Sequence, residues 1–214
     1  MRPKIPAAAR TRACAAGKTA PLIRSELCAS AAYRLLARQN IRSIYSLGTL
    51  DLRRLELGGV ILDSIERFAE ITGEEFYFGG LGATLIYRGR RIILYKESAP
   101  GGLRRLNWTI AHEIGHALLC HAESTRLSEA EADIFAAELL MPEPAVRMLD
   151  ALFGYPLCPD ALTAWFNVSR VAARRRRAEL DRKPFIQTDA GLELTKLLFP
   201  PHIFAGGQIR SLYI

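Results

Sequence analysis

The sequence TIAHEIGHALL, residues 109–119, carries the strongest chemical signal in the chain. It contains a His-Glu-x-x-His motif, formed by His112, Glu113 and His116, within the apolar spacing of an amphipathic helix. Histidines four residues apart project from one helix face, so both imidazoles can reach a single metal ion. The glutamate between them can act as a general base toward water. The motif therefore predicts the core of a zinc hydrolase.

A catalytic zinc site needs a third protein ligand, because such sites use three protein ligands and keep one position open. The metzincin class extends the motif to His-Glu-x-x-His-x-x-Gly-x-x-His. In this chain the glycine position holds Leu119 and the third histidine position holds Ala122, which excludes that class. An acidic residue on a following helix is the alternative.

Residues 128–133, SEAEAD, offer three such acids. Glu129 and Asp133 are four residues apart and share a helix face, so Glu129 can bind the metal while Asp133 orients a ligand histidine. Glu131 is the other possible ligand, but Ser128 followed by Glu131 matches a capping box, which gives this glutamate a structural role. We therefore predict one Zn²⁺ ion held by His112, His116 and Glu129. His121, five residues beyond His116, is expected to be a surface histidine at the helix end.

The pattern of apolar residues predicts a mostly helical α+β fold. Half of the 214 residues are hydrophobic, which suits a single domain with a buried core. Helical periodicity appears in residues 22–39, 57–72, 103–121, 128–140, 160–166 and 169–180. Residues 75–78, 83–87 and 91–95 are rich in β-branched and aromatic side chains and are separated by glycines. They predict a small antiparallel sheet of about three strands packed beside the metal-site helix.

The net charge of +7 is concentrated at two places in the chain. Residues 1–21 are rich in Ala, Arg and Pro, and we expect a disordered basic tail there. We assign residues 22–183 to the main domain and treat residues 184–214 as a C-terminal extension of uncertain structure. The second basic cluster includes four consecutive arginines, Arg174, Arg175, Arg176 and Arg177.

The composition favours a soluble, cytoplasmic protein with no membrane contact. The four cysteines lack Cys-x-x-Cys spacing, which is typical of reduced thiols and not of a disulfide framework. No apolar run approaches the roughly 20 residues that a membrane helix needs. The basic N-terminus has no apolar segment of the kind found in secretory signals.

From about residue 25 to residue 180, the chain resembles the ImmA/IrrE-type metallopeptidases. The resemblance rests mainly on WTIAHEIGHALL, residues 108–119, followed by EAEADIFAAELLMP, residues 129–142. It implies a zincin-like fold and a protease of narrow specificity, whose substrate is a cognate helix-turn-helix transcriptional repressor. Cleavage would derepress mobile-element or stress genes. The resemblance further implies that His112, His116 and Glu129 are metal ligands and that Glu113 is the catalytic base.

Two other functions remain open from the sequence. Residues 160–180 resemble a helix-turn-helix pair, and Arg174, Arg175, Arg176 and Arg177 could contact phosphates weakly. That pattern favours a nucleic-acid-binding regulator. The chain could also bind a repressor without cutting it, in the manner of a toxin–antitoxin partner. The presence of Glu113 argues against this third function, because a pure binder has no need of a base.

Overall fold

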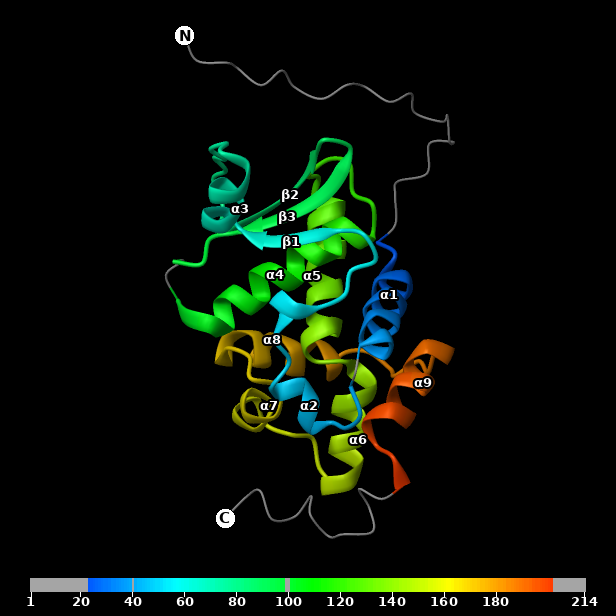
Figure 1. Ribbon diagram of the computed structural model, residues 1–214. Coiled ribbons are helices and arrows are strands. Elements are labelled where there is room, and N and C mark those ends of the chain that lie inside the picture. Colours follow the sequence, from blue (N-terminus) through cyan, green and yellow to red (C-terminus); the bar gives the residue numbers. More distant parts are fainter. Residues whose placement is uncertain (1–22, 40, 99–100, 202–214) are drawn as a thin grey trace, which may run out of the picture.

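The computed structural model describes residues 23–39, 41–98 and 101–201 (Figure 1). In chain order, the elements are α1 (Ser25–Arg38), α2 (Tyr45–Gly48), the 3₁₀ turn η1 (Leu52–Arg54), β1 (Ile61–Ser64), α3 (Ile65–Thr72), β2 (Gly82–Tyr87), β3 (Arg90–Tyr95), α4 (Gly102–Leu118), α5 (Arg126–Leu140), α6 (Glu143–Phe153), α7 (Pro159–Phe166), α8 (Arg170–Leu180) and α9 (Asp189–Leu198). The predicted α+β fold with a helical majority is confirmed.

The centre of the fold is the packed pair α4 and α5, with α1 lying against α5 (Figure 1). Ile110 and Ile114 on α4 meet Phe135 and Leu139 of α5 in one core, and all four side chains are fully buried. In each helix these residues are four apart, so they lie on one face and leave other faces for polar groups. The His-Glu-x-x-His motif therefore lies on a helix that is anchored along its apolar side.

Gly115 allows α4 and α5 to approach closely. A Cβ at this position would lie 3.1 Å from Cα of Ala132 and 3.2 Å from Cβ of Phe135, both on α5. A glycine inside a helix has a conformational cost, and here the close contact explains why it is kept.

We expect Gly115→Ala to lower the free energy of unfolding by about 1–3 kcal/mol, because the added methyl group overpacks the interface between α4 and α5. Urea unfolding monitored by circular dichroism would measure it. Alanine has the higher helix propensity, so a variant more stable than the wild type would show that the close contact is unimportant.

The sheet has the strand order β1-β3-β2 and is mixed, so the predicted purely antiparallel sheet is wrong in this respect. β2 and β3 form the expected antiparallel hairpin, closed by Arg88 and Gly89 with φ angles of 48° and 76°. Both values are positive, as a two-residue type I′ turn requires. β1 pairs with β3 in parallel: the chain passes from β1 through α3 to β2, and the hairpin then reverses it so that β3 runs in the direction of β1.

Two segments near the sheet differ from the prediction. Residues 57–72 do not form one helix: residues 61–64 are β1, and only Ile65–Thr72 are helical. Ser64 accepts a hydrogen bond from the backbone N–H of Arg67 and so begins α3 as its N-cap. Residues 75–78 are not a strand. Phe76 instead packs edge-on against Phe68 of α3. The two rings belong to a small apolar cluster with Ile92 and Leu94 of β3.

The remaining helices complete the core below the sheet. α7 and α8 are joined by a short turn at Asn167, as predicted, and pack against each other. Part of the C-terminal segment that could not be assigned from sequence forms α9, which packs on α1 and α6. The predicted disordered tail, residues 1–21, lies outside the described residues. Within the described part of the chain, no helix is both long and apolar enough to cross a membrane.

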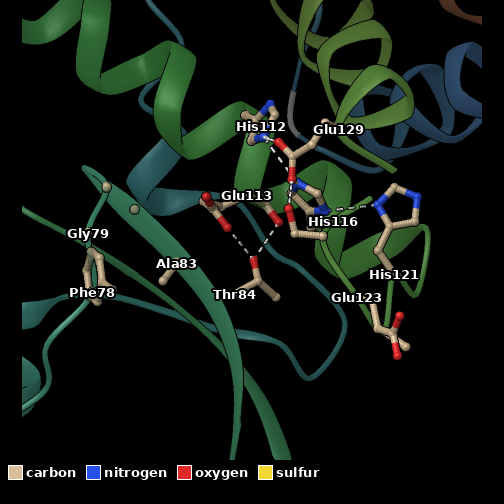
Figure 2. A pocket seen from close by; sticks show the side chains of 14 residues that line it. Phe78, Gly79, Ala83, Thr84, His112, Glu113, His116, His121, Glu123 and Glu129 are labelled. Atoms are coloured by element: carbon tan, nitrogen blue, oxygen red, sulfur yellow. Dashed lines mark hydrogen bonds and ion pairs between the residues drawn. The ribbon is translucent and has the colours of Figure 1, made fainter. Parts of the chain in front are cut away.

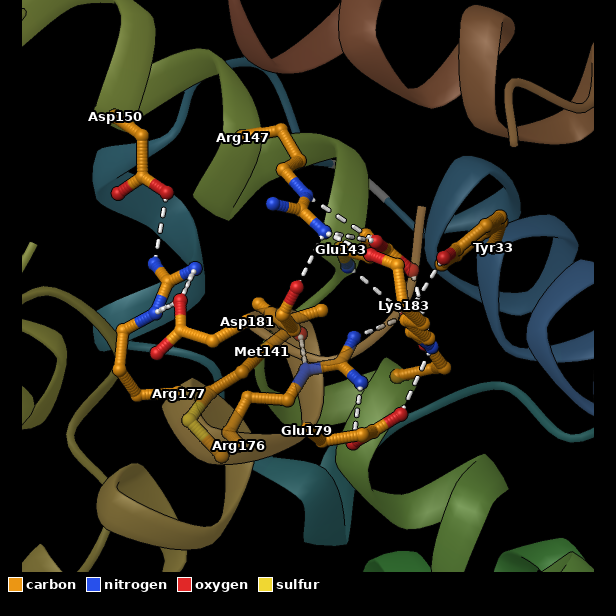
Figure 3. Close-up of polar contacts among 12 residues, drawn as sticks. Tyr33, Met141, Glu143, Arg147, Asp150, Arg176, Arg177, Glu179, Asp181 and Lys183 are labelled. Carbon is orange, nitrogen blue, oxygen red and sulfur yellow. Dashed lines mark hydrogen bonds and ion pairs between the residues drawn. The ribbon is translucent and has the colours of Figure 1, made fainter. Parts of the chain in front are cut away.

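A buried ionic network ties α1, α5, α6 and α8 together (Figure 3). The Arg176 guanidinium is 1% exposed; it lies 2.6 Å from Oε2 of Glu138 and donates to the Met141 carbonyl. Tyr33 donates to the same Glu138 carboxylate at 2.6 Å. Arg177 is also buried and pairs with Asp150 at 2.7 Å.

This burial limits the weak nucleic-acid contact suggested for the four consecutive arginines. Arg176 and Arg177 are held inside the fold by carboxylates and cannot reach a phosphate from there. Successive helix residues are about 100° apart, so a run of four must point to several faces. Arg174 and Arg175 are exposed and remain accessible.

Candidate metal centre and catalytic site

Three side chains from α4 and α5 converge at one point (Figure 2). Each of His112, His116 and Glu129 offers a ligand atom within 4.8 Å of the others. The two Nε2 atoms are 3.1 Å apart, and His116 Nε2 lies 3.5 Å from Oε1 of Glu129. Nitrogen ligands about 2.0–2.1 Å from one tetrahedral zinc ion would be about 3.3 Å apart. The arrangement therefore has the dimensions of a three-ligand site on a single ion.

The hydrogen bonds of His112 support this fit. Its Nδ1 lies 2.9 Å from Oδ1 of Asp133, so Nδ1–H donates to the carboxylate and Nε2 is left with a lone pair facing the other ligands. Burial opposes protonation of His112, but the hydrogen bond and charge of Asp133 outweigh it and raise the pKa. Burial and the neighbouring His112 lower the pKa of His116, which favours the neutral imidazole that binds metal.

Glu129 reaches the site from the first turn of α5. The hydroxyl of Ser124 donates to its Oε1 at 2.6 Å, and this bond, against the effect of burial, lowers the pKa of the carboxyl. The group is therefore ionised near neutral pH and ready to bind a cation.

Glu113 lies beside these three residues and is held by Thr84 on β2. The Thr84 hydroxyl is 2.8 Å from Oε2 of Glu113, and burial raises the pKa of this carboxyl while the hydroxyl opposes the rise. Gly82 makes the approach of β2 possible, because a Cβ there would lie 2.9 Å from Cγ of Glu113 and 2.8 Å from Cγ2 of Thr109. A partly buried carboxylate of raised pKa suits a general base.

These groups open into a cavity of about 480 Å³. Its lining comes from the 78–84 segment, α4, the loop after α4 and the start of α5 (Figure 2) and consists of Phe78, Gly79, Gly80, Gly82, Ala83, Thr84, His112, Glu113, His116, His121, Ala122, Glu123, Ser124 and Glu129. The cavity places Glu113, the three candidate ligands and the half-buried start of β2 in contact with the same solvent space.

A family model described as the IrrE N-terminal-like domain, Peptidase_M78, matches residues 61–177. The chain belongs to this ImmA/IrrE-type peptidase family. The match spans β1 to most of α8 and includes every residue placed at the site so far. No curated protein sequence matches the chain.

The IrrE-type site contains a histidine whose role the sequence did not reveal. His121 was expected at the surface, but its side chain is only 7% exposed. Its Nδ1 lies 3.0 Å from Nδ1 of His116, and its Nε2 lies 3.1 Å from Oε2 of Glu131. The backbone folds back after α4, where Cys120 has φ 57°, and this turns His121 inward. In a continuous helix, residues five apart point in different directions. The sequence alone therefore could not indicate that His121 contacts His116.

Glu131 is likewise placed differently from the predicted capping box. The box at the start of α5 is made by Thr125 and Ser128, one turn earlier than expected. Glu131 is 1% exposed and points away from the metal ligands, toward Arg24 and His121. Glu129, and not Glu131, is therefore the carboxylate grouped with the two histidines.

A tyrosine hydroxyl could act as a donor to a reaction oxyanion, but Tyr87, Tyr95 and Tyr155 do not line the cavity. Tyr87 donates to Glu74, and Tyr95 is buried in the core. Tyr155 lies beyond the end of α6 and is exposed. His121 does line the cavity, but its two ring nitrogens have the partners described above.

The stability of this IrrE-type fold should depend on pH through Glu131. Hydrogen bonds from Arg24, against the effect of burial, hold the pKa of Glu131 at about 2, below its ordinary value of 4.5. A carboxyl with a lowered pKa stabilises the fold above its unfolded pKa and loses this contribution as the pH falls through its folded pKa. A lowering of this size corresponds to on the order of 3 kcal/mol.

We therefore expect Glu131→Gln to be less stable than the wild type above about pH 4.5, with a difference that shrinks as the pH falls toward 2. Urea unfolding of the two metal-free proteins between pH 7 and pH 2 would measure it. A difference that stays constant over this range would contradict the assigned ion pair.

Proposed function

We propose that the protein is a zinc-dependent, site-specific endopeptidase that cleaves a cognate helix-turn-helix repressor in the cytoplasm and so derepresses mobile-element or stress genes. One observation carries the catalytic part: the Glu113 carboxylate lies beside the His112, His116 and Glu129 group in an open cavity. Membership of a peptidase family supports the same reaction.

Each residue at the site has a separate role in the proposed reaction. A bound zinc ion supplies Lewis-acid polarisation of the peptide carbonyl and of a water molecule. Glu113 takes the proton of the attacking water and passes it to the leaving amine. Thr84 holds the carboxylate of Glu113 in place through its 2.8 Å hydrogen bond. Asp133 keeps His112 oriented with Nε2 toward the site.

The wall of the cavity supports an extended peptide as substrate. β2 pairs with β3 along one edge, and among the described residues no strand pairs with its other edge. Gly82, Ala83 and Thr84 of this strand line the cavity. An extended chain can add to such an edge through backbone hydrogen bonds, which would lay a peptide bond across the site.

The test is incubation of the zinc-loaded protein, and of Glu113→Gln, with the repressor encoded beside its gene. Intact-mass spectrometry would report two fragments with the wild type and none with the variant. An unrelated helix-turn-helix protein serves as the substrate control and should stay whole. If both proteins bind the repressor and neither cuts it, the chain acts as a repressor-binding partner and the proposal fails.

DNA binding is the second candidate, favoured by the exposed Arg174 and Arg175 on α8. Two accessible arginines give few phosphate contacts, so this function would need further basic residues. Salt-sensitive binding to duplex DNA by a protein that retains no zinc would support it and would contradict the peptidase.

A further inference from the structure

His116 has a partner on the side of its ring that faces away from the metal ligands. Its Nδ1 lies 3.0 Å from Nδ1 of His121, and the two rings meet edge to face with an interplanar angle of 76°. His121 comes from the loop after α4 and is held there by the backbone bond from its N–H to the His116 carbonyl, at 3.1 Å. Both the ring and the backbone of His121 are therefore attached to His116.

The other nitrogen of His121 meets a buried carboxylate. Its Nε2 is 3.1 Å from Oε2 of Glu131, which is 1% exposed. Arg24, immediately before α1, donates to this carboxylate three times: its backbone N–H at 3.0 Å and Nε at 2.9 Å to Oε1, and Nη2 at 2.5 Å to Oε2. Such a fully paired carboxylate is ionised and acts only as an acceptor.

With both imidazoles neutral, these contacts set the tautomer of each ring. Glu131 can only accept, so Nε2 of His121 carries hydrogen and donates to it. In the neutral ring, Nδ1 of His121 is then an acceptor, and the hydrogen between the two histidines belongs to Nδ1 of His116. Nε2 of His116 is left with its lone pair, and this is the atom that faces His112 and Glu129.

We propose that His121 and Glu131 are positioning residues that hold His116 in its metal-binding tautomer and orientation, with Arg24 fixing Glu131. His112 is held by Asp133 directly, whereas His116 is held by a carboxylate acting through a second imidazole. The chain Arg24–Glu131–His121–His116 thus connects the start of α1 to the metal site. This inference rests on the proposed metal-dependent function of the same site.

The test measures metal affinity rather than peptide cleavage. His121→Phe keeps a ring of similar size but removes both nitrogens, and we expect the affinity for Zn²⁺, measured by chelator competition, to fall about 10–100-fold. Co²⁺ substitution gives a second readout: the visible absorption band of a tetrahedral site should weaken or shift. His121→Gln should restore affinity to within a few-fold of the wild type, because its amide can accept from His116 and donate to Glu131.

Tyr33→Phe is the matched control that separates a general loss of fold stability from a specific loss of zinc affinity. It removes the 2.6 Å hydrogen bond to the buried Glu138, which lies on α5 as Glu131 does. The hydrogen bonds that run from Arg24 to His116 are left intact. Its zinc affinity should equal that of the wild type. Should His121→Phe fail to fold, Glu131→Gln carries the same comparison and should weaken zinc binding about 10-fold.

The results separate this inference from the function on which it rests. If the wild type binds zinc and His121→Phe binds it equally well, His121 does not position His116 for metal binding. The proposed metal site is unaffected by that result. An equal loss of zinc affinity in His121→Phe and His121→Gln would also overturn the proposal. The hydrogen bonds of His121 would then not be the cause of its effect on zinc binding. A wild type that binds no zinc would overturn both proposals.

Discussion

Glu113→Gln is expected to lower kcat/KM for repressor cleavage about 10²–10⁴-fold, which is the range that general acid–base catalysis supplies. Glutamine has the same shape and can still accept the hydrogen bond from Thr84, but it cannot take a proton from water. Glu113 is not one of the three grouped ligands, so zinc content should stay at one ion per chain. Cleavage rates and metal analysis on the same samples would measure both quantities.

The matched control is Glu193→Gln, which makes the same change at an exposed glutamate on α9 outside the cavity lining. Its rate should equal that of the wild type. Full cleavage by Glu113→Gln would remove this residue from the mechanism, and loss of zinc from the variant would assign it to metal binding instead.

Arg176→Met is expected to have the largest effect on stability, lowering the free energy of unfolding by about 3–5 kcal/mol. The guanidinium is 1% exposed and lies 2.6 Å from Glu138, whose side chain is 2% exposed (Figure 3). Removing it leaves a buried carboxylate without its main counter-charge. Chemical denaturation would measure the loss.

Arg175→Met is the control, because this neighbour on α8 is exposed. Its effect should stay within about 0.5 kcal/mol. A double variant, Arg176→Met with Glu138→Leu, should recover part of the loss because no buried charge is then left unpaired. Equal stability of Arg175→Met and Arg176→Met would contradict the buried network.

Local spacing made much of the site predictable. His112 and His116 four residues apart must share a face of α4, and Glu129 and Asp133 must share a face of α5. The structure brings the first three together and places Asp133 on the far side of His112. The hairpin of β2 and β3 was predictable for a similar reason, since Arg88 and Gly89 form a two-residue turn between alternating strands.

The parts that escaped prediction depend on contacts between segments distant in sequence. Thr84 meets Glu113 only because Gly82 lets β2 approach α4, and Arg24 reaches Glu131 across 107 positions. The strand at residues 61–64 was hidden because its apolar residues also fit a helical period. Ser64 was the available signal, since its hydroxyl caps the helix that begins at the next residue.

The proposed base role of Glu113 and the proposed cleavage of a repressor both depend on a metal ion at the site. Anomalous diffraction at the zinc absorption edge, from crystals grown with one equivalent of Zn²⁺, tests this most directly. We expect one strong peak between Nε2 of His112, Nε2 of His116 and the carboxylate of Glu129. Zinc bound elsewhere, or no peak among these three side chains, would contradict the proposed metal site.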